Sequence, residues 1–134
     1  MNLFAFIGDD ILSRSEAIDQ SVKEWLGPDI DMETGREVYF ADEMEASKVA
    51  ESYETVSLFS PRKAIIIRNA DKLNAASQNT LLKAFSKSSD SSLVAIEALK
   101  LDKRSKFSKH FSKKGQWKDF KKPWPDKIPQ WIVS

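Results

Sequence analysis

Two short apolar runs constrain this chain most, because a strand without a polar side has to be covered on both faces. Residues 64–67 read Ala-Ile-Ile-Ile and residues 93–96 read Leu-Val-Ala-Ile, with almost no polar alternation. Continuous runs of this kind are typical of the central strands of parallel sheets. Shorter segments at residues 3–7, 38–40 and 116–120 predict three more strands.

The segment after the first strand predicts an amphipathic helix. Asp9 or Asp10 can cap its start, and Gly27-Pro28 ends it. Its apolar residues recur at helical spacing and are expected to face the sheet: Ile11, Ile18, Val22, Trp25 and Leu26. An acidic loop is expected to follow as far as Glu37.

Three further helices are predicted, one capped by Asp42 and running to about Tyr53, one over residues 75–86 and a basic one over residues 103–114. Their expected core positions are Met44, Val49, Tyr53, Leu81, Leu82, Phe85, Phe107 and Phe111. Strands that alternate with helices predict an α/β fold, a three-layer parallel sheet with helices on both faces.

Composition removes several classes of site. The chain has 134 residues, 41% hydrophobic and 31% charged, which suits one soluble globular domain. It has no cysteine, which excludes disulfides, thiolate metal sites and cysteine nucleophiles. His110 is the only histidine, so a Ser-His-Asp triad or a zinc site is not expected, and a surface role is favoured. No signal-peptide pattern or membrane-length apolar stretch is present, so we expect a cytoplasmic location.

The junction after the first strand lacks the residues of a phosphate site. Phosphate-binding α/β domains place a glycine-rich loop with Lys and Ser or Thr there, whereas this chain has Gly8, Asp9 and Asp10. The two carboxylates would repel a phosphate. The Ile-Ile-Ile run ends in Arg68 and Asn69 instead of an acid that could hold magnesium. We therefore expect no ATP hydrolysis and no cofactor, and a binding or scaffolding role.

A response-regulator receiver is an alternative interpretation. Receivers combine paired acids after the first strand with a phosphoacceptor aspartate and a lysine, for which this chain offers Asp9, Asp10, Asp71 and Lys121. Three carboxylates could hold magnesium. Asp71, however, lies four residues past Ile67 and not at the strand end, so the acids are not expected to converge.

Charge is strongly segregated, although the net charge is only +1. Residues 29–54 hold nine acids and two bases, and residues 100–122 hold ten bases and two acids. Opposite ends of the fold are expected to carry opposite potentials. A second alternative is therefore an autonomous nucleic-acid-binding domain that contacts phosphates through its basic helix. The candidate contacts are Lys103, Arg104, Lys106, Lys109 and Lys113.

Leu58 and Phe59 are the strongest candidates for a binding role. They stand between Ser57 and Ser60-Pro61 in a segment too short for an element of its own. Loops normally run over the surface, where an aromatic and an aliphatic anchor can supply most of a binding free energy. The alternative is that both side chains tuck under the preceding helix.

Several of these segments together resemble the delta subunit of the bacterial DNA polymerase III clamp loader. The resemblance covers residues 4–12, 57–62, 67–73, 101–104 and 129–132, in order along nearly the whole chain. Residues 74–83 also resemble the ATP-binding clamp-loader relatives. The missing glycine-rich loop argues against gamma, and the absence of cysteine, hence of a zinc module, argues against both gamma and delta-prime.

The resemblance implies a degenerate AAA+ (P-loop-like) domain without a nucleotide site and without catalysis of its own, in a subunit of the DNA-directed DNA polymerase III holoenzyme, a nucleotidyltransferase complex. It implies that Leu58 and Phe59 plug a pocket on the beta sliding clamp, with Val56 and Ser57 ending the supporting element. Other implied partners are gamma/tau, delta-prime and, through the assembled loader, primed DNA; neither bound ATP nor a membrane is implied.

The end of the chain predicts a change of domain. Pro123, Pro125 and Pro129 interrupt a linker, and residues 130–133 begin a helix about one turn long. We expect the degenerate AAA+ domain to occupy residues 1–122, and residues 123–134 to form a linker and the start of a helical lid in a longer protein.

Overall fold

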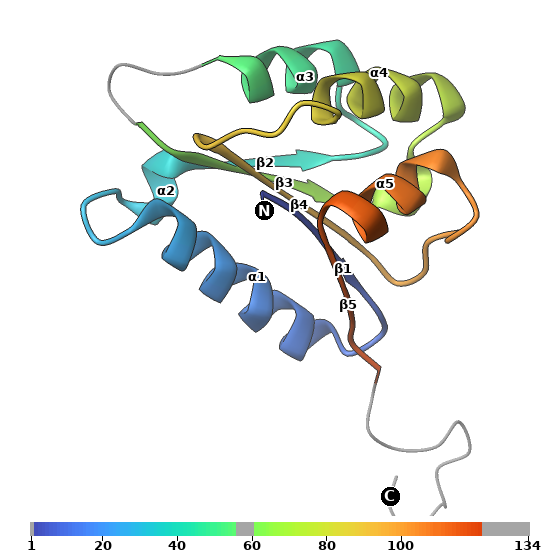
Figure 1. Ribbon diagram of the computed structural model, residues 1–134. Helices are drawn as coiled ribbons and strands as arrows, with labels where there is room; N and C mark the ends of the chain where they lie inside the picture. The colour runs from blue at the N-terminus through green and yellow to red at the C-terminus, as the bar shows by residue number, and fades with distance from the viewer. Residues whose placement is uncertain (1, 56–60, 122–134) are drawn as a thin grey trace, which may run out of the picture.

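The computed structural model describes residues 2–55 and 61–121, which form a parallel sheet between two layers of helices (Figure 1). All four strand pairings are parallel, and the strand order is β2-β3-β4-β1-β5. The elements are β1 (Leu3–Ile7), α1 (Ile11–Leu26), α2 (Met32–Gly35), β2 (Arg36–Phe40), α3 (Ala46–Glu54), β3 (Lys63–Arg68), the 3-10 turn η1 (Ala70–Lys72), α4 (Ala75–Phe85), β4 (Ser92–Ala98), α5 (Lys106–Lys114) and β5 (Gln116–Asp119). The predicted α/β fold is confirmed.

The core has one cluster on each face of the sheet. Ile18, Val22 and Leu26 of α1 pack on Phe6 and Ile66 from one side. Helices α3, α4 and α5 cover the other face, as Figure 1 shows, where Phe85, Phe107 and Phe111 are almost fully buried. Because β3 and β4 supply buried residues to both clusters, their continuous apolar character is explained.

Several predicted boundaries were wrong for local reasons. The expected acidic loop contains α2, because the Asp31 side chain accepts from Glu33 N and caps a short turn. Asp42 caps no helix: Phe40 O accepts from the amides at 43 and 44, which makes a turn, and α3 begins only at Ala46. The basic helix begins at Lys106, after the Ser105 cap.

Four expected core positions also differ. Ile11 is 60% exposed because it lies in the first turn of α1, where the sheet no longer covers the helix. Trp25, Met44 and Leu82 are only partly buried at the borders of the two clusters. The remaining expected core residues, such as Val49 and Leu81, are buried as predicted.

Because all strands run in the same direction, the sheet has one border where every strand begins and one where every strand ends. We call the first border the amino edge and the second the carboxyl edge; neither term refers to an outer strand.

The charged stretches lie at opposite sides of the sheet. The acidic stretch forms α2, β2 and α3 at one side, and the basic stretch forms α5 and β5 at the other, since β2 and β5 are the outer strands. The expected separation of charge is thus confirmed. No helix among the described residues has the length and apolar character that crossing a membrane requires.

Candidate functional site

The turn between β1 and α1 is closed at the position where a phosphate loop would be open. Gly8 has φ +146°, and a Cβ there would lie 1.9 Å from Phe120 O. Asp10 N also donates to Phe120 O at 3.0 Å. The Asp10 carboxylate caps α1 by accepting from Ser13 N, as one of the two predicted caps. The junction is therefore tied to the chain leaving β5, and the Gly8 and Asp10 amides are already bonded to Ala98 O and Phe120 O.

A buried arginine fills the space behind this turn. Arg14 is 8% exposed, and its Nη1 donates to Gly8 O at 2.6 Å and to Ala98 O at 3.1 Å. Its Nε has no hydrogen-bond partner among the described residues and lies 3.7 Å from Glu97 Oε2, while Arg68 Nε lies 3.4 Å from Glu97 Oε1. We call Arg14, Glu97 and Arg68 the arginine cluster. The cluster connects the carboxyl ends of β1, β3 and β4 through ion pairs and hydrogen bonds of its charged side chains.

Our sequence analysis missed Arg14, although a signal was present. Residues 14, 18, 22 and 26 are spaced four apart along α1, and the last three are the apolar residues that face the sheet. A charged residue on the same helix face as these apolar residues either is buried beside the core or lies beyond the end of the core. Since a buried arginine needs partners, the carbonyl groups and the carboxylate at the strand ends are the expected ones.

The receiver interpretation fails on geometry. Asp71 is exposed in η1, whereas Asp10 is occupied as the helix cap. Within residues 2–55 and 61–121, no three acidic or histidine side chains are grouped so that they could hold a metal ion. Asp9, Asp10 and Asp71 are therefore not brought together.

The predicted clamp-contacting residues Val56, Ser57, Leu58 and Phe59 lie outside the described residues. The chain on either side of them is described, at the amino edge between α3 and β3. We call residues 56–60 the docking segment, and its flanks, residues 52–55 and 61–63, the stem.

Tyr53 fixes the first flank of the stem. It is 3% exposed; its hydroxyl accepts from Asn2 Nδ2 at 2.8 Å and donates to Lys87 O, and Ser92 Oγ donates to Tyr53 O at 2.9 Å. Burial raises the pKa of Tyr53. Tyr53 thus ties the end of α3 to the start of β1 through its side chain and to the start of β4 through its carbonyl.

A polar cluster connects the two flanks. Lys63 Nζ donates to Ser52 Oγ at 3.3 Å, and Ser52 Oγ donates to Glu37 Oε1 at 2.7 Å. Glu37 also accepts from the Tyr39 hydroxyl. Burial, followed by this hydrogen bond to Glu37, raises the pKa of Tyr39 to about 12.

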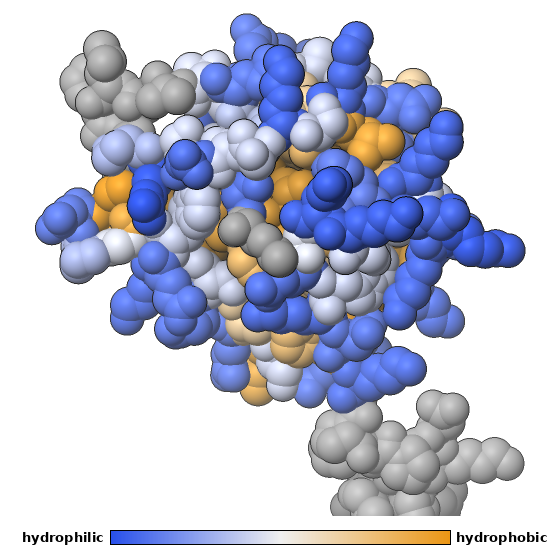
Figure 2. All heavy atoms as spheres, in the orientation of Figure 1, coloured by the Kyte–Doolittle hydropathy of each residue, from blue (hydrophilic) through white to orange (hydrophobic). Residues whose placement is uncertain are grey.

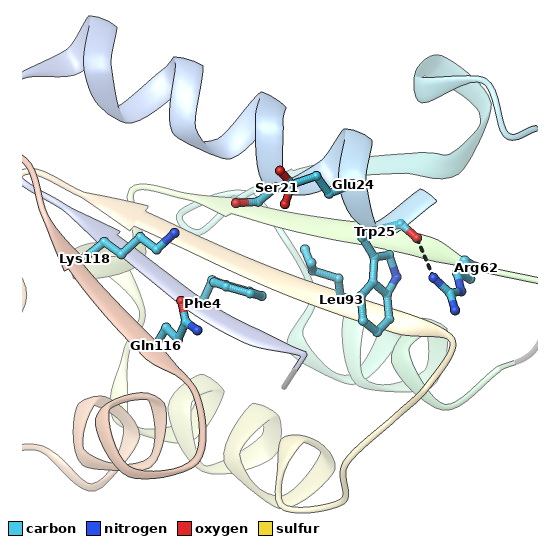
Figure 3. A pocket seen from close by; sticks show the side chains of 8 residues that line it. All are labelled: Phe4, Ser21, Glu24, Trp25, Arg62, Leu93, Gln116 and Lys118. Atoms are coloured by element: carbon cyan, nitrogen blue, oxygen red, sulfur yellow. Dashed lines mark hydrogen bonds between the residues drawn. The ribbon is translucent and has the colours of Figure 1, made fainter. Parts of the chain in front are cut away.

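Trp25, at the end of α1, fixes the second flank (Figure 3). Its Nε1 donates to Lys63 O, and its own carbonyl accepts from Arg62 Nη1, both at 3.0 Å. The Arg62 guanidinium lies 5.4 Å from the centre of the indole ring. Beside these residues lies a groove of about 310 Å³, with Phe4, Leu93 and Lys118 also in its lining. Lys118 lies over the Phe4 ring.

The basic helix presents its charges outward. Phe107 and Phe111 are buried in the core, whereas Lys103, Arg104, Lys106, Lys109 and Lys113 are exposed. Figure 2 shows hydrophilic side chains projecting where α5 lies in Figure 1. Lys103 pairs with Asp119 and Arg104 with Asp102, and within the described part of the chain no ion pair involves the other three. His110 is partly buried, and its Nε2 lies 2.9 Å from Phe85 O, so it connects α5 to α4.

Comparison with known proteins identifies the family. The family described as "DNA polymerase III, delta subunit" matches residues 4–121. Among solved structures, the Bacillus subtilis DNA clamp loader delta protein (YqeN) is similar, with a TM-score of 0.68 at 18% sequence identity, which supports the fold. The similarity covers 90% of this chain and 38% of that one, so this chain spans well under half of that protein. No curated protein matches. Since the family match spans almost all the described residues, this chain belongs to the DNA polymerase III delta subunit family.

Proposed function

We propose that this domain binds the ring-shaped sliding clamp through Leu58 and Phe59, supported by Val56 and Ser57, and helps to open it without hydrolysing ATP. The observation that supports this most is the closed carboxyl edge in a member of the delta family. Protein charges and a tight turn lie where a nucleotide-binding relative needs free amides and a lysine. The domain is suited to a mechanical role.

In this role the docking segment binds the open or strained clamp more tightly than the closed one. A partner shifts a conformational equilibrium only through its differential affinity for the two states. The assembled partners would be gamma/tau, delta-prime and primed DNA in the cytoplasmic DNA polymerase III holoenzyme. The degenerate AAA+ assignment and the domain boundary near residue 122 belong to the same proposal.

The test is calorimetric binding of this chain to the clamp, with Leu58→Ala and Phe59→Ala introduced together. We expect a loss of about 2–4 kcal/mol for each anchor, because truncated hot-spot residues cost that much. The matched control is Ile11→Ala with Leu12→Ala, an apolar pair 60% and 70% exposed at the carboxyl edge. Unchanged affinity in the docking-segment variant, or equal losses in both, would contradict the proposal.

A second function is favoured by one observation, namely that α5 buries its aromatic residues and exposes its lysines. We propose that Lys106, Lys109 and Lys113, flanked by Lys103 and Arg104, contact DNA phosphates in the loader. Changing the three lysines to Gln should weaken DNA binding and lower the slope of log K against log salt by about 3, near 0.9 for each lost phosphate contact. The exposed lysines 72, 83 and 87, changed together, provide the control. An unchanged slope would exclude this contact.

A further inference from the structure

We propose that Trp25 is a positioning residue for clamp binding. It acts through the stem of the docking segment and does not itself contact the clamp. The inference rests on the proposed function of Leu58 and Phe59. It starts from the contacts of Trp25, which belongs to α1, far from β3 in sequence. Trp25 is bonded to Arg62, as Figure 3 shows, and to Lys63, two of the three residues in the second flank of the stem.

The contacts of Trp25 fix the backbone of Lys63 and the side chain of Arg62. The indole Nε1–H donates to Lys63 O, so it sets where β3 begins. The Trp25 carbonyl and ring face hold the Arg62 guanidinium by a hydrogen bond and a cation–π contact. The amide of Lys63 donates to Ser91 O at 2.8 Å, which attaches the same residue to the neighbouring strand.

The opposite flank is fixed independently, and the two flanks are joined. Tyr53 holds the end of α3 through Asn2, Lys87 and Ser92. The Lys63 ammonium reaches across to Ser52 Oγ at 3.3 Å. Hydrogen bonds therefore hold both flanks of the docking segment. Trp25 is the contribution from α1, which lies on the opposite face of the sheet from α3.

A fixed stem favours binding by limiting the conformations that the free segment has to give up. Fixing a backbone residue costs conformational entropy, so a preorganised attachment reduces the free energy that association must supply. Loss of the indole hydrogen bond would loosen the stem and weaken clamp binding without removing any clamp contact.

The test is a double-mutant cycle on clamp affinity. Trp25→Phe keeps an aromatic ring for packing and for Arg62 but removes the N–H that Lys63 O accepts. We expect about a fivefold weaker clamp affinity in the otherwise native chain, the equivalent of one hydrogen bond. We expect no further loss when the change is added to Leu58→Ala/Phe59→Ala, because a residue that acts through the anchors has nothing left to position.

Trp117→Phe is the matched control. Trp117 is also half-buried, donates its indole N–H to Asp119 at 3.1 Å and lies beneath a cation, Lys103, but it is on β5 at the other side of the sheet. Its substitution should leave clamp affinity unchanged. In parallel, hydrogen exchange of the Lys63 amide should accelerate in Trp25→Phe and stay unchanged in Trp117→Phe.

The outcomes separate this inference from the function on which it rests. If the double alanine variant binds the clamp as tightly as the native chain, the proposed function fails and the inference fails with it. If the double alanine variant loses binding, the proposed function stands, and the positioning role of Trp25 can be overturned alone. It is overturned if Trp25→Phe binds the clamp normally, if it weakens binding equally in both backgrounds, or if it leaves hydrogen exchange of the Lys63 amide unchanged.

Discussion

The two edges of the sheet are both dense in hydrogen bonds, but the bonds do different things. At the carboxyl edge, Arg14, Glu97 and Arg68 place charges where a nucleotide-binding domain keeps room for phosphates. At the amino edge, Trp25 and Tyr53 fix the two flanks of the stem, residues 52–55 and 61–63. The contacts close the first edge, whereas those at the second hold a stem that, in the function we propose, supports clamp binding.

The comparison separates two kinds of binding site. A ligand site needs unsatisfied groups that converge on an open space, whereas groups at the carboxyl edge are bonded to one another. A docking surface needs anchors on a rigid support, and the stem would be that support in the function we propose. In that proposal, binding uses the amino edge and not the carboxyl edge.

Glycine substitutions should separate the two edges most strongly. Gly8→Ala places a methyl group 1.9 Å from Phe120 O at φ +146°, so we expect a loss of more than about 4 kcal/mol in the free energy of unfolding. Gly27→Ala, at the end of α1, has nothing within 4 Å of the new Cβ, but its φ of +79° and ψ of 177° lie in a region that essentially only glycine populates, which predicts a loss of about 2 kcal/mol. Urea unfolding of both variants measures the difference, and equal losses would contradict it.

The arginine cluster should contribute the next largest effect. Arg14→Met keeps much of the side-chain volume but removes two carbonyl contacts and leaves the mostly buried Glu97 with Arg68 alone. We expect a loss of about 3 kcal/mol in the free energy of unfolding, as for other broken buried pairs. Arg104→Met breaks an exposed pair and should leave the urea midpoint unchanged. If the Arg14 variant were as stable as the native chain, the carboxyl edge would not depend on this cluster.

The smallest expected effect concerns the Tyr39–Glu37 pair beneath the stem. The folded pKa of Tyr39 is about 12, above its ordinary value of 10.0, so the neutral hydroxyl is favoured in the fold. Between these two pH values the unfolded chain binds fewer protons than the native one, and stability falls as pH rises. Tyr39→Phe should show a shallower loss of unfolding free energy over this window in urea titrations. The same slope in both proteins would show that Tyr39 does not couple to folding.

Sequence patterns predicted the layers of this fold better than its polar contacts. Residues 64–67 and 93–96 are apolar without interruption because helices cover both faces, so strand type and parallel pairing could be inferred. Asp42 could not be placed from its identity alone, since a carboxylate can cap a helix or occupy a turn. It lies in a turn because Phe40 O accepts from the amides of residues 43 and 44.

The functional regions were predicted only in part, for a related reason. The missing phosphate loop is visible in the order of residues 8–10, because that motif is local. The spacing of residues 14, 18, 22 and 26 indicates that Arg14 is buried. Its contact with Ala98 and that of Trp25 with Lys63 join residues far apart in sequence, so local spacing does not identify the individual partner residues. Leu58 and Phe59 as clamp anchors remain a prediction from an apolar pair in a short connecting segment and from a family resemblance.

The position of β1 has a consequence for how the chain acquires its structure during synthesis. This strand emerges first from the ribosome, yet both of its neighbours are late: Leu3 pairs with Val94, and Phe4 pairs with Gln116. Its apolar residues must wait until most of the domain has been translated, since pairings so distant in sequence form slowly. Nascent chains that stop before β5 should remain open to proteases and chaperones, and completion of the last strand should mark the point at which the domain becomes resistant.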